Sequence, residues 1–373
     1  MKIRSASVHH YCLPLRASWL TAAGGFRQRE GWLLRLDTAD GATGYGDCAP
    51  LPGNAAECPA DTALRLRRQT HSLIGRQPGD ALQAIDHGSR GSTPAVRLAV
   101  ETALLDLIAQ AAGLPLAAYL LACERRAVGV SEVSPTVRVN AALGSVAAVH
   151  DQDLRAACAA RFQVLKLKVG MTAIDQEIGR LQQLARLLPP GVELRLDANC
   201  AWGLRDAARF LHACADLPVE MVEEPLARPA LKQLQALQDS TGIAIAMDES
   251  LATLDLEEVL GRRPVRRLVI KPTRTGGLLP ALALARRATG AGFECIVTSS
   301  VESACGVTAA AHLAAALDNP LAHGLATCEC LADDTGTPPA IANGRLTLPD
   351  TPGVGFAPHA QVVFSDFAGP DRS

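Results

Sequence analysis

The sequence predicts an α/β protein built from a closed parallel barrel and a smaller α+β lobe. The chain has 373 residues, more than one ordinary compact core needs. Its first third contains strand-like segments followed by helical ones. From about residue 130, short apolar runs alternate with helix-length segments. Eight such units in succession are typical of a parallel (β/α) barrel.

The first lobe is expected to begin as an antiparallel meander. Residues 3–15 and 31–36 have the pattern of strands, with a loop expected across residues 17–29 and a turn at Asp40-Gly41. From residue 62 to residue 121 the apolar spacing becomes helical, most clearly over residues 96–108. Strands followed by helices describe an α+β lobe, which we place at residues 1–129.

Eight apolar runs define the expected barrel over residues 130–330. They fall at residues 137–141, 164–169, 193–197, 219–223, 243–248, 267–271, 295–299 and 322–326. Helix-length segments separate them, so each run is expected to be a parallel strand. The tail, residues 331–373, carries one strand-like run at 345–348 and is too polar for another βα unit. We therefore expect the tail to return to the first lobe.

The charge balance indicates a small-molecule partner. With 36 basic and 38 acidic residues the chain has a formal net charge of −2, without the basic excess that binding to nucleic acid or an anionic membrane requires. No apolar stretch is long enough for a membrane span and the start lacks a signal-peptide core, so we expect a cytoplasmic protein. The eleven cysteines include no CxxC pair, which favours buried thiols over a structural zinc site.

Lysine is scarce, and its positions are informative. Five of the 36 basic residues are lysine and the remaining 31 are arginine. A lysine kept inside an apolar run indicates a need for an amine that can exchange a proton, which arginine cannot supply. Lys166 and Lys168 lie in the second run and Lys271 ends the sixth.

Three acids occupy matching positions on neighbouring runs. Asp197 ends the third run, Glu223 the fourth and Asp248 the fifth. Because the C-terminal ends of barrel strands meet at one rim, we expect these carboxylates to lie close together, beside the lysines. Carboxylates this close repel one another unless a cation lies between them. Hard oxygen ligands favour Mg²⁺, or Mn²⁺ in its place, over zinc.

The two lysines of the second run alternate with leucines, so both amines are expected to face inward. Burial, mutual repulsion and a nearby cation would lower a lysine pKa toward the ~7–8 that suits a general base. Each acid alone is more typical of a helix cap or loop anchor, but their shared register favours a functional site. Gly276-Gly277 is open to two interpretations, an anion cradle at a helix start or a plain turn.

These residues resemble the enolase superfamily, and within it the muconate-lactonizing subgroup. The similarity lies in Lys166-Leu-Lys168 and in residues 194–202, 241–250, 269–273 and 299–303, together with residues 49–53 of the first lobe. The amino-acid sequences of these segments are most similar to those of the o-succinylbenzoate synthase family of menaquinone biosynthesis. The resemblance implies a modified (β/α)7β TIM-like barrel with an N-terminal α+β capping domain completed by the C-terminal tail.

The resemblance also implies roles for individual residues. The implied metal ligands are Asp197, Glu223 and Asp248, and the implied catalytic residues are Lys168 as the base with Lys166 and Lys271 as stabilising charges. Asn199 and Glu249 would support these groups, and Thr298, Ser299 and Ser300 would contact the substrate on its carboxylate side. Loops near residues 22–29 and 50–54 would close over the substrate. The implied reaction dehydrates a cyclohexadiene carboxylate to o-succinylbenzoate through an ene-diolate.

Several alternatives stay open at this point. Gly276-Gly277 is more similar to the racemase and cycloisomerase members. An N-succinylamino acid racemase and a muconate cycloisomerase-type enzyme stay open because they share the same catalytic set. The eighth run lacks the Asp-x-Asp pair with which dipeptide epimerases hold a substrate ammonium, which disfavours that activity. A Schiff-base aldolase would explain an inward lysine but not three carboxylates. A barrel that binds metal without catalysis is a further alternative, and whether the chain forms a homo-oligomer is open.

Overall fold

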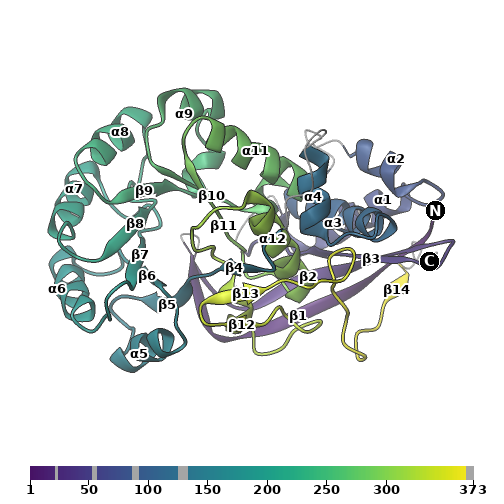
Figure 1. Ribbon diagram of the computed structural model, residues 1–373, viewed down its shortest axis with the longest axis horizontal. Coiled ribbons are helices and arrows are strands. Elements are labelled where there is room, and N and C mark those ends of the chain that lie inside the picture. The colour runs from purple at the N-terminus through teal and green to yellow at the C-terminus, as the bar shows by residue number, and fades with distance from the viewer. Residues whose placement is uncertain (22–23, 53–56, 86–91, 125–132, 367–373) are drawn as a thin grey trace.

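The computed structural model of the chain describes all residues except 22–23, 53–56, 86–91, 125–132 and 367–373. It contains a four-stranded antiparallel sheet and a separate, strongly curved seven-stranded parallel sheet covered by helices on its outer side (Figure 1). The expected fold class, a TIM-like barrel with a capping domain, is thereby confirmed. None of the described helices combines the length and apolarity needed to cross a membrane.

The antiparallel sheet has the strand order β14-β1-β2-β3. Its strands are β1 (Ile3–Thr21), β2 (Gly24–Thr38), β3 (Thr43–Cys48) and β14 (Ser365–Asp366). The prediction of a loop across residues 17–29 is wrong, because the β1–β2 hairpin continues to the pair Thr21↔Gly24. The pairing has a register shift between Pro14 and Trp19. Proline has no N–H for the ladder, so the pairing is interrupted and then resumes. Residues 24–29 are therefore strand, and residues 22–23, 53 and 54 of the expected capping loops lie outside the described residues.

Helices pack beside this sheet. They are α1 (Pro59–His71), α2 (Pro78–Gln83) and α3 (Pro94–Ala111). The next helix, α4 (Leu116–Glu124), packs mainly against the barrel helix α12 (Ala304–Leu317) instead. Helix α3 is buried on nearly its whole circumference, because one side packs against β3 and another reaches the barrel helices α10 (Pro272–Thr275) and α11 (Leu278–Gly290). It is the central contact between the two parts of the fold.

The parallel sheet has the strand order β11-β10-β9-β8-β7-β6-β5. Its strands are β5 (Ala141–Ser145), β6 (Val164–Lys168), β7 (Glu193–Asp197), β8 (Val219–Glu223), β9 (Ala244–Met247), β10 (Arg267–Ile270) and β11 (Glu294–Val297). The intervening helices are α5 (Asp151–Ala159), α6 (Ile174–Ala185), α7 (Leu204–Ala213), α8 (Leu231–Asp239), α9 (Leu256–Arg262) and α12 (Ala304–Leu317), besides α10 and α11.

The first and eighth barrel runs differ from expectation. Residues 137–141 divide: β4 (Thr136–Arg138) leaves the barrel to pair with β13 (Arg345–Thr347), and β5 begins only at Ala141. The eighth run contributes two isolated parallel bridges, Val139↔His323 and Thr298↔Gly324, before the 3-10 helix η3 (Ala326–Cys330) begins. These bridges still close the barrel, because they join the segments that precede β5 and follow β11.

The C-terminal tail contacts both parts of the fold. Strand β12 (Ile341–Ala342) and β13 form a hairpin beside β4, whereas β14 adds to the outer edge of β1. The expected run at residues 345–348 is thus a strand, paired with the segment leading into the barrel.

Gly276-Gly277 makes room for an internal carboxyl group, that of Glu101. The buried Glu101 carboxylate, carried by α3, accepts hydrogen bonds from the backbone N–H groups of Leu278 and Leu279, at 3.2 Å for the latter. These amides begin α11, where the unpaired N–H groups of the first turn favour an acceptor oxygen. Burial outweighs these hydrogen bonds and raises the pKa of Glu101 to about 8. A Cβ at Gly277 would lie 2.5 Å from Glu101 Oε2, so only glycine allows this approach.

Replacing Gly277 with alanine should therefore destabilise the protein. The added methyl group displaces the carboxylate from the two amides, and we expect the free energy of unfolding in urea to fall by about 1–2 kcal/mol. Gly179→Ala is the matched control, because Gly179 lies inside α6 with no heavy atom within 4 Å of the new Cβ. It should raise stability by about 0.5–1 kcal/mol. A Gly277→Ala variant as stable as the wild type would contradict this account.

Candidate active site

A cavity of about 340 Å³ lies at the C-terminal ends of the barrel strands. All the residues expected to bind metal, to act in catalysis, to support these groups or to contact the substrate line it, and they come from six consecutive strands and the segments that follow them. They are Lys166, Lys168, Asp197, Asn199, Glu223, Asp248, Glu249, Lys271, Thr298, Ser299 and Ser300. From the first lobe, the described lining residues are Ser18, Trp19 and Leu51. The cavity thus lies between barrel and capping domain.

Strand register brings the charged side chains together. Lys168 on β6 is the direct partner of Asp197 on β7, which is in turn the partner of Glu223 on β8. Leu165 and Leu167 are fully buried on the opposite face of β6, as the alternation of side chains along a strand requires. The lysines are therefore left on the inward face, beside the acids.

Lys166 bridges two of the carboxylates. Its Nζ lies 3.0 Å from Asp197 Oδ2 and 2.7 Å from Glu223 Oε2. Burial opposes the charged form of this amine, but the attraction of the two carboxylates outweighs burial and holds the pKa of Lys166 above its ordinary value. This direction is the opposite of the one that a general base requires. Its geometry suits a fixed positive charge.

The surroundings of Glu223 show whether the three acids suit a bound cation. Its side chain is 1% exposed, and Oε1 has no hydrogen-bond partner among the described residues. Burial and the repulsion of Asp197 raise the pKa of Glu223 to about 8. For Asp197, burial raises the pKa, but Lys166 and Lys168 outweigh it, so the pKa lies below its usual range. A buried carboxylate oxygen without a partner, beside two further carboxylates, fits a hard divalent cation.

Lys168 is held on one side of the acids. Its Nζ lies 3.4 Å from Asp197 Oδ2 and donates a hydrogen bond to Asn199 Oδ1. Asn199 in turn donates through Nδ2 to Glu249 Oε1 at 3.1 Å. Asn199 has a φ of +43°, a left-handed conformation that asparagine tolerates better than most residues. The chain Glu249–Asn199–Lys168 thus fixes the position of the amine.

Lys271 occupies the other side. It directly precedes α10, and its Nζ pairs with Asp248 Oδ2, while Arg274 Nη1 lies 3.1 Å from Asp248 Oδ1. Burial alone would raise the pKa of Asp248, but these two cations outweigh it and lower the pKa. Sequence reasoning missed Arg274. Its spacing of three residues from Lys271 would have placed both on one face of a helical turn.

Arg195 was also missed, and it forms the floor of the cavity. It lies two residues before Asp197 on β7, so both side chains face the barrel interior. Its Nε lies 2.7 Å from Glu220 Oε1, and Nη1 donates to Asn140 Oδ1 at 3.1 Å and to the Ala322 carbonyl at 2.9 Å. These contacts join β7 and β8 to the segments that close the barrel.

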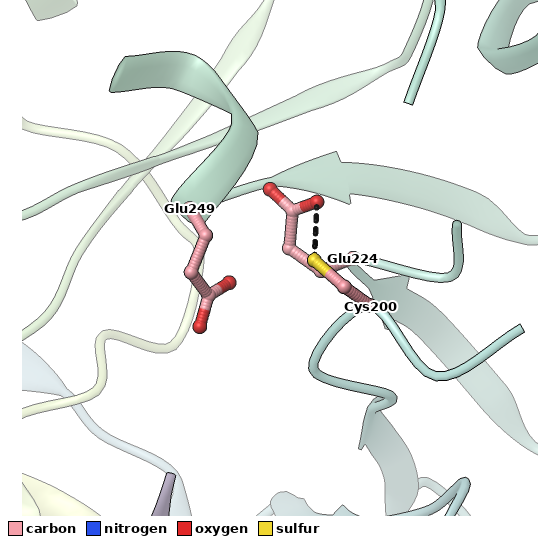
Figure 2. A group of neighbouring side chains, drawn as sticks. All are labelled: Cys200, Glu224 and Glu249. Atoms are coloured by element: carbon pink, nitrogen blue, oxygen red, sulfur yellow. Dashed lines mark hydrogen bonds between the residues drawn. The ribbon is translucent and has the colours of Figure 1, made fainter. Parts of the chain in front are cut away.

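Cys200, Glu224 and Glu249 form a neighbouring cluster whose potential ligand atoms lie within 4.8 Å of one another (Figure 2). Glu224 Oε1 already accepts from the Asp248 and Ser250 backbone N–H groups, at 2.5 and 2.8 Å, and from Ser250 Oγ at 2.6 Å. Burial, followed by the charge of Glu224, raises the pKa of the Cys200 thiol to about 12, so the thiolate that metals prefer is disfavoured. We interpret this cluster as the support of the loop that carries Asp248.

The far wall of the cavity consists of residues 298–300 and part of the eighth run. Ser300 Oγ lies 2.9 Å from Thr273 Oγ1, and Ser299 Oγ bonds to Thr327 Oγ1. The eighth-run residues that line the cavity are Gly324, Ala326 and Thr327, none of which carries a charge. The sequence has no Asp-x-Asp pair at this run, and among the described residues no other acid takes its place on that wall.

The capping domain holds this wall in place. The Arg29 guanidinium, 0% exposed, donates to the Val301 carbonyl at 3.0 Å, to Pro50 at 2.6 Å and to Ala49 at 2.9 Å. Val301 has a φ of +63°, which is unusual for a β-branched residue. Asp47 on β3 accepts from the backbone N–H and the hydroxyl of Ser303, both at 2.9 Å. The two domains thus share buried polar contacts beside the cavity.

A capped parallel barrel whose rim gathers acids and lysines is the architecture of an α/β-barrel enzyme. The chain belongs to the enolase superfamily: the family described as "Enolase C-terminal domain-like" matches residues 149–362, and that described as "MenC, N-terminal domain" matches residues 3–107.

Relatives span nearly the whole chain. The L-Ala-D/L-Glu epimerase of Bacillus subtilis is 31% identical over 366 residues, covering 95% of this chain and 97% of the relative. The chloromuconate cycloisomerase of Cupriavidus pinatubonensis is 27% identical and covers 92% and 93%. Among solved structures, the dipeptide epimerase of Enterococcus faecalis in complex with Mg and L-Leu-L-Tyr has a TM-score of 0.85, with 28% identity, 96% of this chain and 100% of that chain covered.

Proposed function

We propose that the protein is a Mg²⁺-dependent enzyme that removes the proton α to a substrate carboxylate. The observation that carries this proposal is the buried Oε1 of Glu223, without a partner among the described residues, beside Asp197 and Asp248. These three acids would hold the ion. A divalent cation bound there would supply a Lewis acid that polarises the substrate carboxylate.

The lysines take different roles in this proposal. Lys168, oriented by Asn199, removes the α-proton, and the electron pair moves onto the carboxylate as the ene-diolate forms. Lys166, fixed between Asp197 and Glu223, supplies positive charge where negative charge develops. Lys271, across the cavity, stabilises the same charge from the opposite side. Thr298, Ser299 and Ser300 contact the carboxylate side of the substrate.

The reaction that we propose is the syn-dehydration of 2-succinyl-6-hydroxy-2,4-cyclohexadiene-1-carboxylate to o-succinylbenzoate. Lys168 takes the α-proton and returns a proton to the departing β-hydroxyl on the same face, so water leaves and the ring becomes aromatic. The match of residues 3–107 to the MenC-type N-terminal domain supports this assignment. So does a far wall without charge, which suits a substrate lacking an ammonium group. A menaquinone-pathway enzyme of the cytoplasm is the corresponding biological setting.

A second candidate is an N-succinylamino acid racemase or a muconate cycloisomerase-type enzyme. It is favoured by the placement of Lys168 and Lys271 on opposite sides of the acids, which suits proton transfer at both faces of one carbon. The N-succinyl-L-Arg/Lys racemase of Bacillus cereus is 24% identical over 84% of this chain. Dipeptide epimerisation, named for several relatives, ranks lower because the described residues of the far wall include no acid to hold a substrate ammonium.

For the chain as a whole we propose three functional parts. Residues 1–129 form the capping domain, residues 130–330 the catalytic barrel, and residues 331–373 the segment that completes the cap. The substrate is a small carboxylate, and neither nucleic acid nor a membrane takes part.

Metal dependence is the first test. Asp197→Asn, Glu223→Gln and Asp248→Asn should each lower turnover at least ~10²-fold, because each removes a negative ligand of the cation. Asp239→Asn, an exposed change at the end of α8, is the control and should leave turnover unchanged. Dehydration assays with and without excess chelator measure the effect. Full activity in chelator would disprove the metal proposal.

The identity of the base is tested by Lys168→Arg. The variant keeps the positive charge beside Asp197 but cannot lose a proton near neutral pH, so turnover should fall by about 10²–10⁴-fold while Mn²⁺ binding, followed by calorimetry, survives. Lys232→Arg, on the exposed face of α8, is the matched control. Near-normal turnover of Lys168→Arg would assign the proton transfer to another residue.

Lys271 distinguishes dehydration from racemisation. In the dehydratase it is a fixed charge, so Lys271→Arg should keep more activity than Lys168→Arg, although the bulk of guanidinium will reduce turnover. In deuterated solvent the wild type should release aromatic product without interconverting the enantiomers of an N-succinyl amino acid. If instead α-deuterium enters both enantiomers as fast as dehydration proceeds, both lysines act as bases and the racemase, or a bifunctional enzyme, is the correct assignment.

A further inference from the structure

A second cavity, of about 250 Å³, opens at the opposite end of the barrel from the candidate active site. Its lining comes from segments where barrel strands begin, and from the turn of the tail hairpin β12–β13. The lining residues are Arg138, Val139, Arg161, Gln163, Ala322, Asn343, Gly344 and Arg345. Gln163 immediately precedes β6, and Ala322 precedes the bridge at His323. Nothing in the proposed reaction uses this end of the barrel.

Three arginines of this cavity have no acidic partner among the residues that the structure describes. Arg138 donates to the Pro320 carbonyl at 2.8 Å and to Gln163 Oε1 at 2.7 Å, and Arg345 Nε donates to Thr136 Oγ1 at 2.8 Å. All of these acceptors are neutral. The Arg161 guanidinium has neither a hydrogen bond nor an ion pair in the described part of the chain. None of the lining residues in the described part of the chain is an acid, so within that part three positive charges share the cavity without compensation.

Strand pairing forces two of these charges together. Arg138 on β4 and Arg345 on β13 are direct partners in the antiparallel ladder, a placement that destabilises a sheet when both residues carry the same charge. The third arginine lies against the same hairpin, because a Cβ at Gly344 would be 2.7 Å from the Arg161 carbonyl oxygen. Neutral hydrogen bonds fix Arg138 and Arg345 without reducing the repulsion.

We propose that this cavity binds a small oxyanion with at least two negative charges, a phosphate or a dicarboxylate. Guanidinium groups recognise both chemistries through paired N–H donors. Gln163 uses its oxygen to accept from Arg138 and so keeps its NH2 group as a further donor. The bound anion would neutralise the cross-strand pair and connect the tail hairpin to the barrel, which stabilises the folded state.

Binding is tested with inorganic phosphate on the full-length protein, by calorimetry and thermal unfolding, with sodium chloride at matched ionic strength as reference. Phosphate at ten times its dissociation constant should lower the ratio of unfolded to folded protein about 11-fold relative to chloride. Succinate forms the second arm. Saturable binding of either anion supports the site and identifies which chemistry it accepts.

The double variant Arg138→Gln/Arg345→Gln locates the binding. It should lose the saturable heat and the phosphate-dependent stabilisation, yet melt in chloride no lower than the wild type, because the repulsion is removed. Should the double variant fold poorly, Arg161→Gln, an exposed change, replaces it. Arg155→Gln on α5 removes an exposed arginine outside the cavity and should bind as the wild type does. The proposal is overturned if chloride stabilises the protein as much as phosphate and succinate do. It is also overturned if a cavity variant binds the anion as tightly as the wild type, which is the result expected if the anion binds among the active-site lysines.

Discussion

The mutual proximity of buried like charges is the constraint on which the rest of this structure depends. Asp197, Glu223 and Asp248 are nearly inaccessible to solvent, and carboxylates so placed are costly unless cations offset them. Lys166 and Lys271 do so through direct ion pairs. The barrel supplies what this balance requires, because adjacent parallel strands deliver one charged residue each to the same rim. The supporting contacts then keep those charges from relaxing apart.

The acids and lysines could be predicted because their signal is local. Each stands at the end of a short apolar run, and the alternation along β6 alone indicates that Lys166 and Lys168 face inward while the leucines pack outward. Six of the eight runs, the second to the seventh, also correspond to barrel strands for the same reason, since a buried parallel strand is recognisable from continuous apolar residues. The structure shows where these side chains lie, whereas their roles in the reaction are proposed.

What could not be predicted depends on contacts between distant segments. The eighth run is apolar enough for a strand, yet Gly324 and η3 limit it to two bridges. The β1–β2 hairpin extends through residues that carry turn signals, because pairing across the sheet outweighs local preference. Arg195 looks like an ordinary strand residue until its partners Glu220 and Asn140 are placed around it. Such partners lie far apart in the sequence, so no local pattern records them.

The Arg29 contact has a consequence for recombining relatives of this family. One guanidinium from the capping domain satisfies a barrel carbonyl and two carbonyls of its own domain, so the wall of the pocket is partly encoded in a different domain from the lysines. A chimera that joins the cap of one homologue to the barrel of another would inherit mismatched halves of this junction unless residues 301–303 are exchanged with the cap. The unit of modular exchange is therefore the cap together with that short barrel segment.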